Sequence, residues 1–342
     1  MIFLSFLYVF LIILSLIFIV RTLQSLFIYL SSKIKNFVGT MIEGSENYWR
    51  WRFSRVHGSN KITYDKIDEY HPKRGWTLKK NIKDKLHVAT TVNSNSEGVR
   101  GKNNKYSGKK VLFYGDSFCF GDGVDDDETV SAYFEKNFKN ISCLNLGIHG
   151  YGIDQQYLYL KETISKYSPS LVCFVITDND FRRNLMDFRD SPKPKFIIDK
   201  GDLKLTNVPV PLNKPSSYPT YKLPFEFLKE AFVFYGILNR GKNIKHATLI
   251  LDKIRKETEK AGSKLVFVNI NEVRRGFWYR HFINSFLKRY FKKNNLLYLT
   301  LNNISKNPTE LYDSLSGHLS ATGNKIVANK LSEGVRARNL LK

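Results

Sequence analysis

The distribution of apolar and polar positions divides the chain into three parts. Residues 1–20 carry no charged side chain. Residues 51–108 are polar, basic and interrupted by glycine, and we expect them to form an extended lead-in that wraps the main domain. From residue 110 onward, short apolar runs of strand type alternate with segments whose apolar positions recur at helical spacing. This alternation predicts βαβ units and a parallel sheet covered by helices on both faces.

The alternating region can be divided into individual elements. The first expected elements, in chain order, are a strand at 111–114, a helix at 128–138, a strand at 142–146, a helix at 154–167 and a strand at 171–177. Residues 247–270 repeat the helix-then-strand order, with Gly262 where the helix should stop, and residues 282–301 repeat it again. Residues 320–335 are expected to form a closing helix.

An insert at about 185–243 interrupts the alternation. It contains a predicted hairpin in which residues 196–199 pair with 203–206 around Lys200 and Gly201, followed by a proline-rich return. Long insertions in α/β domains often cover the substrate, although loops that only pack on the domain are nearly as common.

The apolar start predicts a transmembrane anchor at residues 1–21, because about twenty apolar residues span the ~30 Å hydrocarbon core as a helix. A cleaved signal peptide is the weaker interpretation, since the chain shows neither a basic leading region nor a cleavage site of small residues. We expect an amphipathic juxtamembrane helix and the lead-in at 22–108, and the main domain at 109–342. The basic residues flanking the anchor favour a cytoplasmic domain by the positive-inside rule; they are Arg21, Lys33, Lys35, Arg50, Arg52 and Arg55.

The net charge of +23 changes this picture little. Lysines are scattered through every region and no nucleic-acid-binding signature is present, so we expect a solvated basic surface and no nucleic-acid partner. Anionic glycans or lipids remain compatible with this surface. The three cysteines, Cys119, Cys143 and Cys173, lie in or beside apolar runs without metal-ligand spacing, and we interpret them as small buried hydrophobic residues.

Candidate chemistry lies directly after the strands, because an open parallel sheet binds ligands at the carboxyl ends of its strands. Gly115-Asp116-Ser117 follows the first strand, and "NLGIHGYG" follows the second. "TDNDFRRN" follows the third, and "LYDSLSGHLSATGN" comes after the last. Together these segments offer a hydroxyl, a glycine-rich turn, an Asn-Asp pair and a histidine, which can build an acyl-transfer site.

Four of these blocks resemble, in order and spacing, the blocks of the SGNH hydrolases, the GDSL-type esterases and lipases. The matching residues are Gly115-Asp116-Ser117, Gly150, Asn179-Asp180 and His318. The resemblance covers about residues 110–342 and implies a flavodoxin-like three-layer α/β/α sandwich. The upstream "GWTLKKN" and "NSNSEGVRG" also look like the lead-in of membrane-anchored bacterial members.

The resemblance implies a role for each block. Ser117 would be the nucleophile and His318 its general base. The oxyanion donors would be the backbone N–H groups of Ser117 and Gly150 and the side-chain amide of Asn179, each worth about 3 kcal/mol of transition-state stabilisation. No metal and no organic cofactor is expected.

Several of these residues have a simpler structural interpretation. One alternative is that Ser117 has no catalytic role and simply caps the helix that follows its strand. Asp116 and Asp180 are expected to hold turn backbone, and His149 to be a loop or substrate-contact residue. For the acidic run after the nucleophile turn we favour capping of a helix N-terminus over metal binding; the run comprises Asp122, Asp125, Asp126 and Asp127.

Two positions depart from the family pattern. The third triad member usually stands three residues before the histidine, where this chain has Leu315. Either Asp313, five residues before, orients the imidazole, which we favour, or His318 is oriented by a backbone carbonyl alone. The second departure is Asp178, which stands where the third block commonly has glycine.

The function expected from the sequence is that of a membrane-anchored serine esterase acting on an ester-bearing substrate such as an acylated glycan or lipid. One alternative is an O-acyltransferase or deacetylase of envelope polysaccharide, in which the insert aromatics Phe196, Tyr218 and Tyr221 contact sugars. Another is a catalytically inactive scaffold. Anchored relatives often act on envelope glycans, which would place the domain outside the cytoplasm, whereas the charge flank places it inside.

Overall fold

The computed structural model describes most of the domain predicted after the lead-in and part of the lead-in itself. The described residues are 14–15, 18–19, 49–50, 66–88, 90–102, 106–189, 191–212, 240–270, 277–305, 307–313 and 316–341. Across these ranges, the structure contains no helix with the length and apolar character needed to cross a membrane. The expected anchor at 1–21 and juxtamembrane helix fall almost entirely outside the described residues, as do Tyr218 and Tyr221.

A five-stranded parallel sheet forms the centre of the domain. Its strands are β5 (Lys109–Gly115), β6 (Ile141–Asn145), β7 (Leu171–Ile176), β12 (Lys264–Asn269) and β13 (Leu297–Thr300). They lie in the order β6-β5-β7-β12-β13, so the first strand in the chain has the second and the third as its neighbours. This is the doubly wound order of flavodoxin-like sheets, and its switch point lies between β5 and β7. The predicted parallel α/β class is therefore confirmed.

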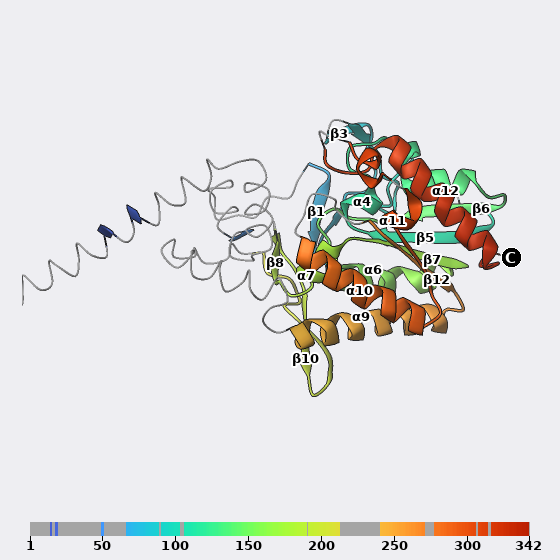
Figure 1. The fold of residues 1–342 in the computed structure, drawn as a ribbon. Coiled ribbons are helices and arrows are strands. Elements are labelled where there is room, and N and C mark those ends of the chain that lie inside the picture. Colours follow the sequence, from blue (N-terminus) through green and yellow to red (C-terminus); the bar gives the residue numbers. More distant parts are fainter. Residues whose placement is uncertain are drawn as a thin grey trace, which may run out of the picture.

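Two buried clusters cover the two faces of the sheet. Leu112 and Tyr114 of β5 belong to one cluster, whereas Val111 and Phe113 belong to the other, as alternation along a strand requires. The first cluster includes side chains of α6 (Ile153–Tyr167), α9 (Arg240–Lys260) and α10 (Phe277–Lys293). The second includes α5 (Val130–Lys136) and α12 (Ala321–Ala337). Figure 1 shows α9 and α12 on opposite sides of the sheet.

The predicted strands and helices are confirmed, and the largest differences are at helix starts. α9 is helical from Arg240, although periodicity indicated a helix only from 247, and α10 is helical from Phe277 instead of 282. The early part of α9 reads "RGKNIKH", in which only Ile244 is strongly apolar. A helix segment with so few buried positions carries almost no periodic signal, which explains the late predicted start.

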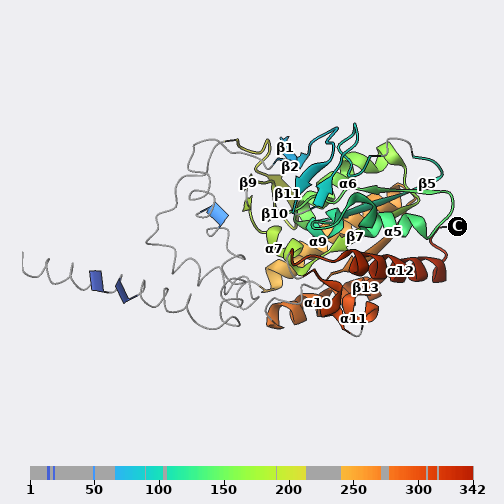
Figure 2. The ribbon, with the colours of Figure 1, turned by 90° about the horizontal axis from the view of Figure 1, so that it is seen from above.

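The described part of the lead-in belongs to the same core as the sheet. It forms two antiparallel hairpins, β1 (Asp68–His71) with β2 (Gly75–Leu78) and β3 (Lys85–His87) with β4 (Thr90–Val92). Trp76, Leu78 and Val92 are buried in the cluster that also contains α6. Figure 2 shows β1 and β2 on the α6 side of the sheet, away from α12.

The insert forms the predicted hairpin, β10 (Lys195–Asp199) with β11 (Asp202–Thr206). Lys200 and Gly201 both have positive φ, 47° and 89°, as a tight two-residue hairpin turn requires. Phe196 is only 6% exposed, and its ring centroid lies 5.9 Å from that of Tyr157. The expectation that Phe196 contacts sugars is therefore wrong, because its ring is committed to the core between the hairpin and α6.

Candidate active site

Residues 115–121 form the turn that carries Ser117, the nucleophile turn expected from the sequence. It connects β5 to the short helix α4 (Ser117–Phe120) without an intervening loop. Asp116 is the N-cap of α4, and its Oδ1 accepts the backbone N–H of Phe118 at 3.0 Å. Ser117 is the first helical residue and is 9% exposed. The interpretation of Ser117 as a mere helix cap is therefore wrong, because Asp116 fills that role and leaves the serine hydroxyl for another partner.

Two glycines allow the chain segments around this turn to approach closely. A Cβ on Gly115 would overlap the carbonyl oxygen of Val175 and the Cβ of Cys119. A Cβ on Gly147, in the loop after β6, would overlap the backbone nitrogen of Phe120. The nucleophile turn is thus packed directly against the carboxyl ends of both neighbouring strands, β7 and β6.

The partner of the serine hydroxyl is His318, which lies between the short helix η3 (Pro308–Leu311) and α12. Its Nε2 is 2.8 Å from Ser117 Oγ, and its Nδ1 is 3.1 Å from the carbonyl oxygen of Ser316. A carbonyl accepts only, so Nδ1 carries the proton and Nε2 accepts from the serine hydroxyl. This is the tautomer that a general base for Ser117 requires.

Asp313 lies in the same loop and holds its backbone. Its Oδ2 accepts the N–H of Ser316 at 2.6 Å, and its own N–H donates to the carbonyl of His318 at 2.8 Å. The hydrogen bond that the structure gives to Nδ1 of His318 goes to a backbone carbonyl, which is the second of the two arrangements considered from the sequence. A role of Asp313 as the third triad member stays a prediction.

The expected oxyanion donors come from the carboxyl ends of neighbouring strands. Asn179 is the second residue of α7 (Asp178–Arg183), which follows β7, and Gly150 lies in the loop after β6 with φ +77°. Since β6 and β7 flank β5 in the sheet, Gly150 and Asn179 reach the same edge as Ser117. Asp178, at the family's glycine position, is the buried first residue of α7. The roles of Gly150 and Asn179 as donors stay predictions.

A buried ion-pair network lies beneath the nucleophile turn. Nη1 of Arg183 is 2.8 Å from Asp116 Oδ2 and 3.0 Å from Asp180 Oδ1, and both carboxylates are fully buried. Asp180 also accepts the backbone N–H of Thr177 at 3.1 Å. Burial and the neighbouring Asp116 carboxylate raise the pKa of Asp180 well above its usual value. The expectation that Asp116 and Asp180 hold turn backbone is confirmed.

Arg100, in the lead-in, supports the end of the nucleophile turn, and the sequence did not single it out. Its buried guanidinium donates to the carbonyls of Phe120, Gly121 and Val124, the last two at 2.7 Å. It also pairs with Asp126 at 2.9 Å. Among so many basic residues, nothing in the sequence marks this one as buried, so only the fold reveals that the lead-in helps to position the turn that carries Ser117.

The acidic run after the turn divides into residues with different roles. Asp125 caps the short helix η1 (Asp126–Glu128), as expected, and its N–H donates to Glu128 Oε2 at 3.2 Å. Asp122 does not cap a helix, so that expectation is wrong for it. Its buried Oδ1 lies 3.1 Å from His87 Nε2, and its Oδ2 lies 3.9 Å from His318 Nε2. Burial alone would raise the pKa of Asp122, but the His87 hydrogen bond and the surrounding histidines hold that pKa below its usual value.

Comparison with known proteins gives matches among solved structures alone. No family model matches the chain, and no curated protein matches it. The esterase EstA from Pseudoalteromonas sp. is 12% identical with a TM-score of 0.42, over 68% of this chain and 98% of that one. Axe2, an acetylxylan esterase from Geobacillus stearothermophilus, is 19% identical with a TM-score of 0.41, over 67% and 94%. A lipolytic protein of the G-D-S-L family from Desulfitobacterium hafniense is 14% identical with a TM-score of 0.41, over 66% and 99%. The chain is thus similar to two esterases and to a member of the G-D-S-L group that its sequence motifs resemble.

Proposed function

We propose that the chain is a serine esterase of the SGNH type, which cleaves ester bonds through an acyl-enzyme on Ser117. The observation that carries this proposal is the 2.8 Å contact between Ser117 Oγ and His318 Nε2, with Nδ1 of the same ring on a carbonyl. The pair lies at the carboxyl end of β5, next to the switch point where doubly wound sheets bind ligands.

The reaction follows from this geometry. Ser117 Oγ attacks the ester carbonyl carbon while His318 Nε2 takes the hydroxyl proton. The oxyanion receives hydrogen bonds from the N–H groups of Ser117 and Gly150 and from the Asn179 amide. The tetrahedral intermediate collapses, the C–O bond to the alcohol breaks, and His318 returns the proton to the leaving alcohol. Water then attacks the acyl-enzyme with His318 as base, which releases the acid and regenerates the serine.

The hydrogen bond between Ser117 and His318 favours an active enzyme over an inactive scaffold. A scaffold without catalytic activity would not require the serine hydroxyl to be aligned with the basic nitrogen of the imidazole. Hydrolysis and O-acyl transfer share every step up to the acyl-enzyme and differ only in the acceptor. We therefore propose hydrolysis as the basal activity, which needs water alone.

The proposal is tested by labelling the detergent-solubilised full-length chain with a fluorophosphonate probe, which reacts with activated serines. We expect labelling of wild type and its loss in Ser117→Ala and His318→Ala, since removal of either member of such a pair abolishes most of the activity. Ser165→Ala, an exposed serine on α6, is the matched control and should label as wild type does. Folded wild type that does not label, or labelling that persists in Ser117→Ala, would refute the proposal.

We also propose that residues 1–21 anchor the enzyme in a membrane, on the strength of their length and lack of charge. The full-length chain should stay with the membrane pellet after alkaline carbonate extraction. A double variant with Leu11→Arg and Ile13→Arg should be released, because each arginine near the centre of a span costs about 3 kcal/mol. Wild type in the soluble fraction would contradict the anchor and leave the esterase proposal untouched.

A further inference from the structure

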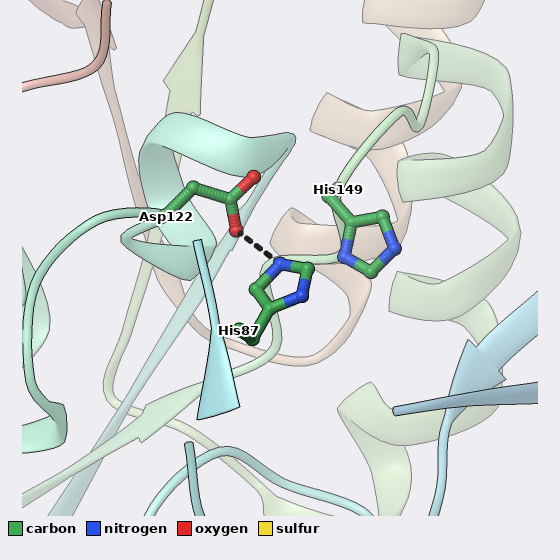
Figure 3. A group of neighbouring side chains, drawn as sticks. All are labelled: His87, Asp122 and His149. Atoms are coloured by element: carbon green, nitrogen blue, oxygen red, sulfur yellow. Dashed lines mark hydrogen bonds and ion pairs between the residues drawn. The ribbon is translucent and has the colours of Figure 1, made fainter. Parts of the chain in front are cut away.

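Two histidines and one aspartate form a cluster beside the Ser117–His318 pair. His87 ends β3, Asp122 lies in the turn after α4, and His149 lies in the loop after β6. One nitrogen or oxygen atom of each side chain lies within 4.8 Å of the corresponding atoms of the other two. Figure 3 shows the three side chains converging from these separate segments. Nothing in the mechanism above uses this cluster.

The ring of His149 is oriented so that one nitrogen faces the cluster. Its Nε2 lies 2.5 Å from Asp68 Oδ2, a carboxylate of the lead-in. Figure 3 shows the other nitrogen, Nδ1, directed toward His87 and Asp122. An Nε2–H donated to Asp68 leaves the lone pair of Nδ1 on the cluster side. Such a carboxylate–imidazole pair is the usual arrangement that fixes the tautomer of a metal-binding histidine.

The spacing of the three groups fits a small metal ion after a modest contraction. Around a tetrahedral ion with bonds of about 2.0–2.2 Å, the ligand atoms lie about 3.3–3.6 Å apart. Asp122 Oδ1 and His87 Nε2, at 3.1 Å, are already close to this separation. The widest separation, up to 4.8 Å, has to close by about 1.3 Å, which rotation of an imidazole ring can supply.

Burial and composition of the cluster point in the same direction. The side chains of His87, Asp122 and His149 are 10%, 9% and 20% exposed, so the group is nearly enclosed but still reaches solvent. Two imidazoles and one carboxylate suit zinc and related dications, and three protein ligands leave a fourth position for water or a substrate oxygen.

We propose that His87, Asp122 and His149 bind one divalent transition-metal ion of the zinc class. The proposal goes beyond the esterase assignment and does not depend on it. Asp122 presents Oδ1 to this site and holds Oδ2 3.9 Å from Nε2 of His318, so the ion lies next to the Ser117–His318 pair. The three ligands are 35 and 27 positions apart in the chain, a spacing that matches no metal-binding motif, so they cannot be recognised from the sequence.

The experiment is a titration of full-length, chelator-treated protein, without a histidine tag, with Zn²⁺ in detergent, together with the visible absorption of Co²⁺ as a report on the ligands. We expect one ion per chain. His87→Gln, Asp122→Asn and His149→Gln should each weaken the affinity at least tenfold, and Asp68→Asn should weaken it by about 10- to 100-fold through the orientation of His149. His71→Gln is the matched control and should bind as wild type does. His318→Gln should also bind the ion, which separates this site from the proposed esterase.

Two results would overturn the proposal. One is wild-type protein that takes up no stoichiometric ion from micromolar Zn²⁺ and gives no tetrahedral Co²⁺ spectrum. The other is a His87→Gln, His149→Gln double variant that binds Zn²⁺ as tightly as wild type. In either case the cluster is only a hydrogen-bonded group. Because the first result comes from the unaltered chain, a variant that fails to fold does not weaken the test.

Discussion

The nucleophile turn (residues 115–121) and the histidine loop (residues 311–320) carry the proposed nucleophile and base but are held in different ways. The nucleophile turn is held by segments from across the chain. Arg100 of the lead-in donates to its carbonyls, Asn145 of β6 donates to the carbonyl of Cys119 at 3.0 Å, and Arg183 of α7 binds Asp116. The position of Ser117 therefore depends on contacts with several distant parts of the domain.

Among its described residues, the histidine loop makes most of its hydrogen bonds to itself, while Leu311 and Leu319 pack in the cluster that contains α12. Asp313 accepts from Ser316 and donates to the carbonyl of His318, and the Ser316 carbonyl orients the imidazole. Ser320 then caps α12 by accepting the N–H of Gly323 at 3.0 Å. These contacts join residues that are close to one another in the sequence, and they are partly exposed. The difference indicates that substitutions around the serine will act through folding, whereas substitutions around the histidine will act on catalysis with the fold intact.

The largest expected effect is on the nucleophile side, from Arg183→Met. Methionine fills part of the volume but leaves the buried Asp116 and Asp180 carboxylates without their cation, so the free energy of unfolding should fall by about 3–5 kcal/mol. Urea denaturation measures the change. Lys139→Met, on the exposed surface, should change it by less than about 0.5 kcal/mol. Equal losses of unfolding free energy in the two variants would show that the Arg183 ion pairs do not stabilise the nucleophile turn.

A smaller effect is expected where the loop after β6 meets the turn. In Gly147→Ala the new methyl group would overlap the backbone of Phe120, and such overpacking typically costs about 1–3 kcal/mol. The midpoint temperature of thermal unfolding and the rate of ester hydrolysis should fall together, because the backbone shift that relieves the overlap also moves Ser117. Gly241→Ala, with open space around it, is the control. Lost activity with unchanged stability would show that the turn is not held as firmly as described.

The histidine loop gives the opposite expectation, with Asp313 as the test position. Where the Ser316 carbonyl alone orients the imidazole, Asp313→Asn, which keeps an oxygen that can accept the N–H of Ser316, should lower kcat by less than about tenfold, or 1.4 kcal/mol. Asp313→Ala removes that acceptor and should lower kcat further, with the free energy of unfolding nearly unchanged. A loss of about 10⁴-fold in Asp313→Asn would instead identify Asp313 as a true triad carboxylate.

The sequence predicted the sheet and the pairing of Ser117 with His318 for a physical reason. Strands buried on both faces, such as β7, are continuous apolar runs, and their ends are marked by abrupt polar residues. Ser117 and Asn179 therefore stood out at strand ends. The pairing of Ser117 with His318 followed from the order of the blocks.

The supporting contacts could not be predicted, because they join residues far apart in the chain. Arg100, His87 and Arg183 are ordinary basic or polar residues in the sequence, and only folding buries them against Phe120, Asp122 and Asp116. For the same reason the sequence does not distinguish Asp122 from its acidic neighbours, although its carboxylate lies beside the two imidazoles of His87 and His149. The partner of His318 Nδ1 cannot be read from the sequence, since a backbone carbonyl is independent of side-chain identity.

The smallest expected effect is a pH dependence confined to the nucleophile side. Because the pKa of Asp180 is raised in the folded chain, the folded state binds a proton more tightly than the unfolded state does. This stabilisation is fully present below the ordinary aspartate pKa of about 3.9 and is lost as the pH rises through the folded value. In Asp180→Asn, position 180 no longer carries a titrating carboxyl. The free energy of unfolding of the variant, minus that of wild type, should therefore become more positive as the pH rises through that window. Denaturation of both chains at a series of pH values measures this difference. A difference that stays flat would mean that Arg183 fully compensates the buried carboxylate, and Asp180 would then contribute no pH dependence to the stability of the nucleophile turn.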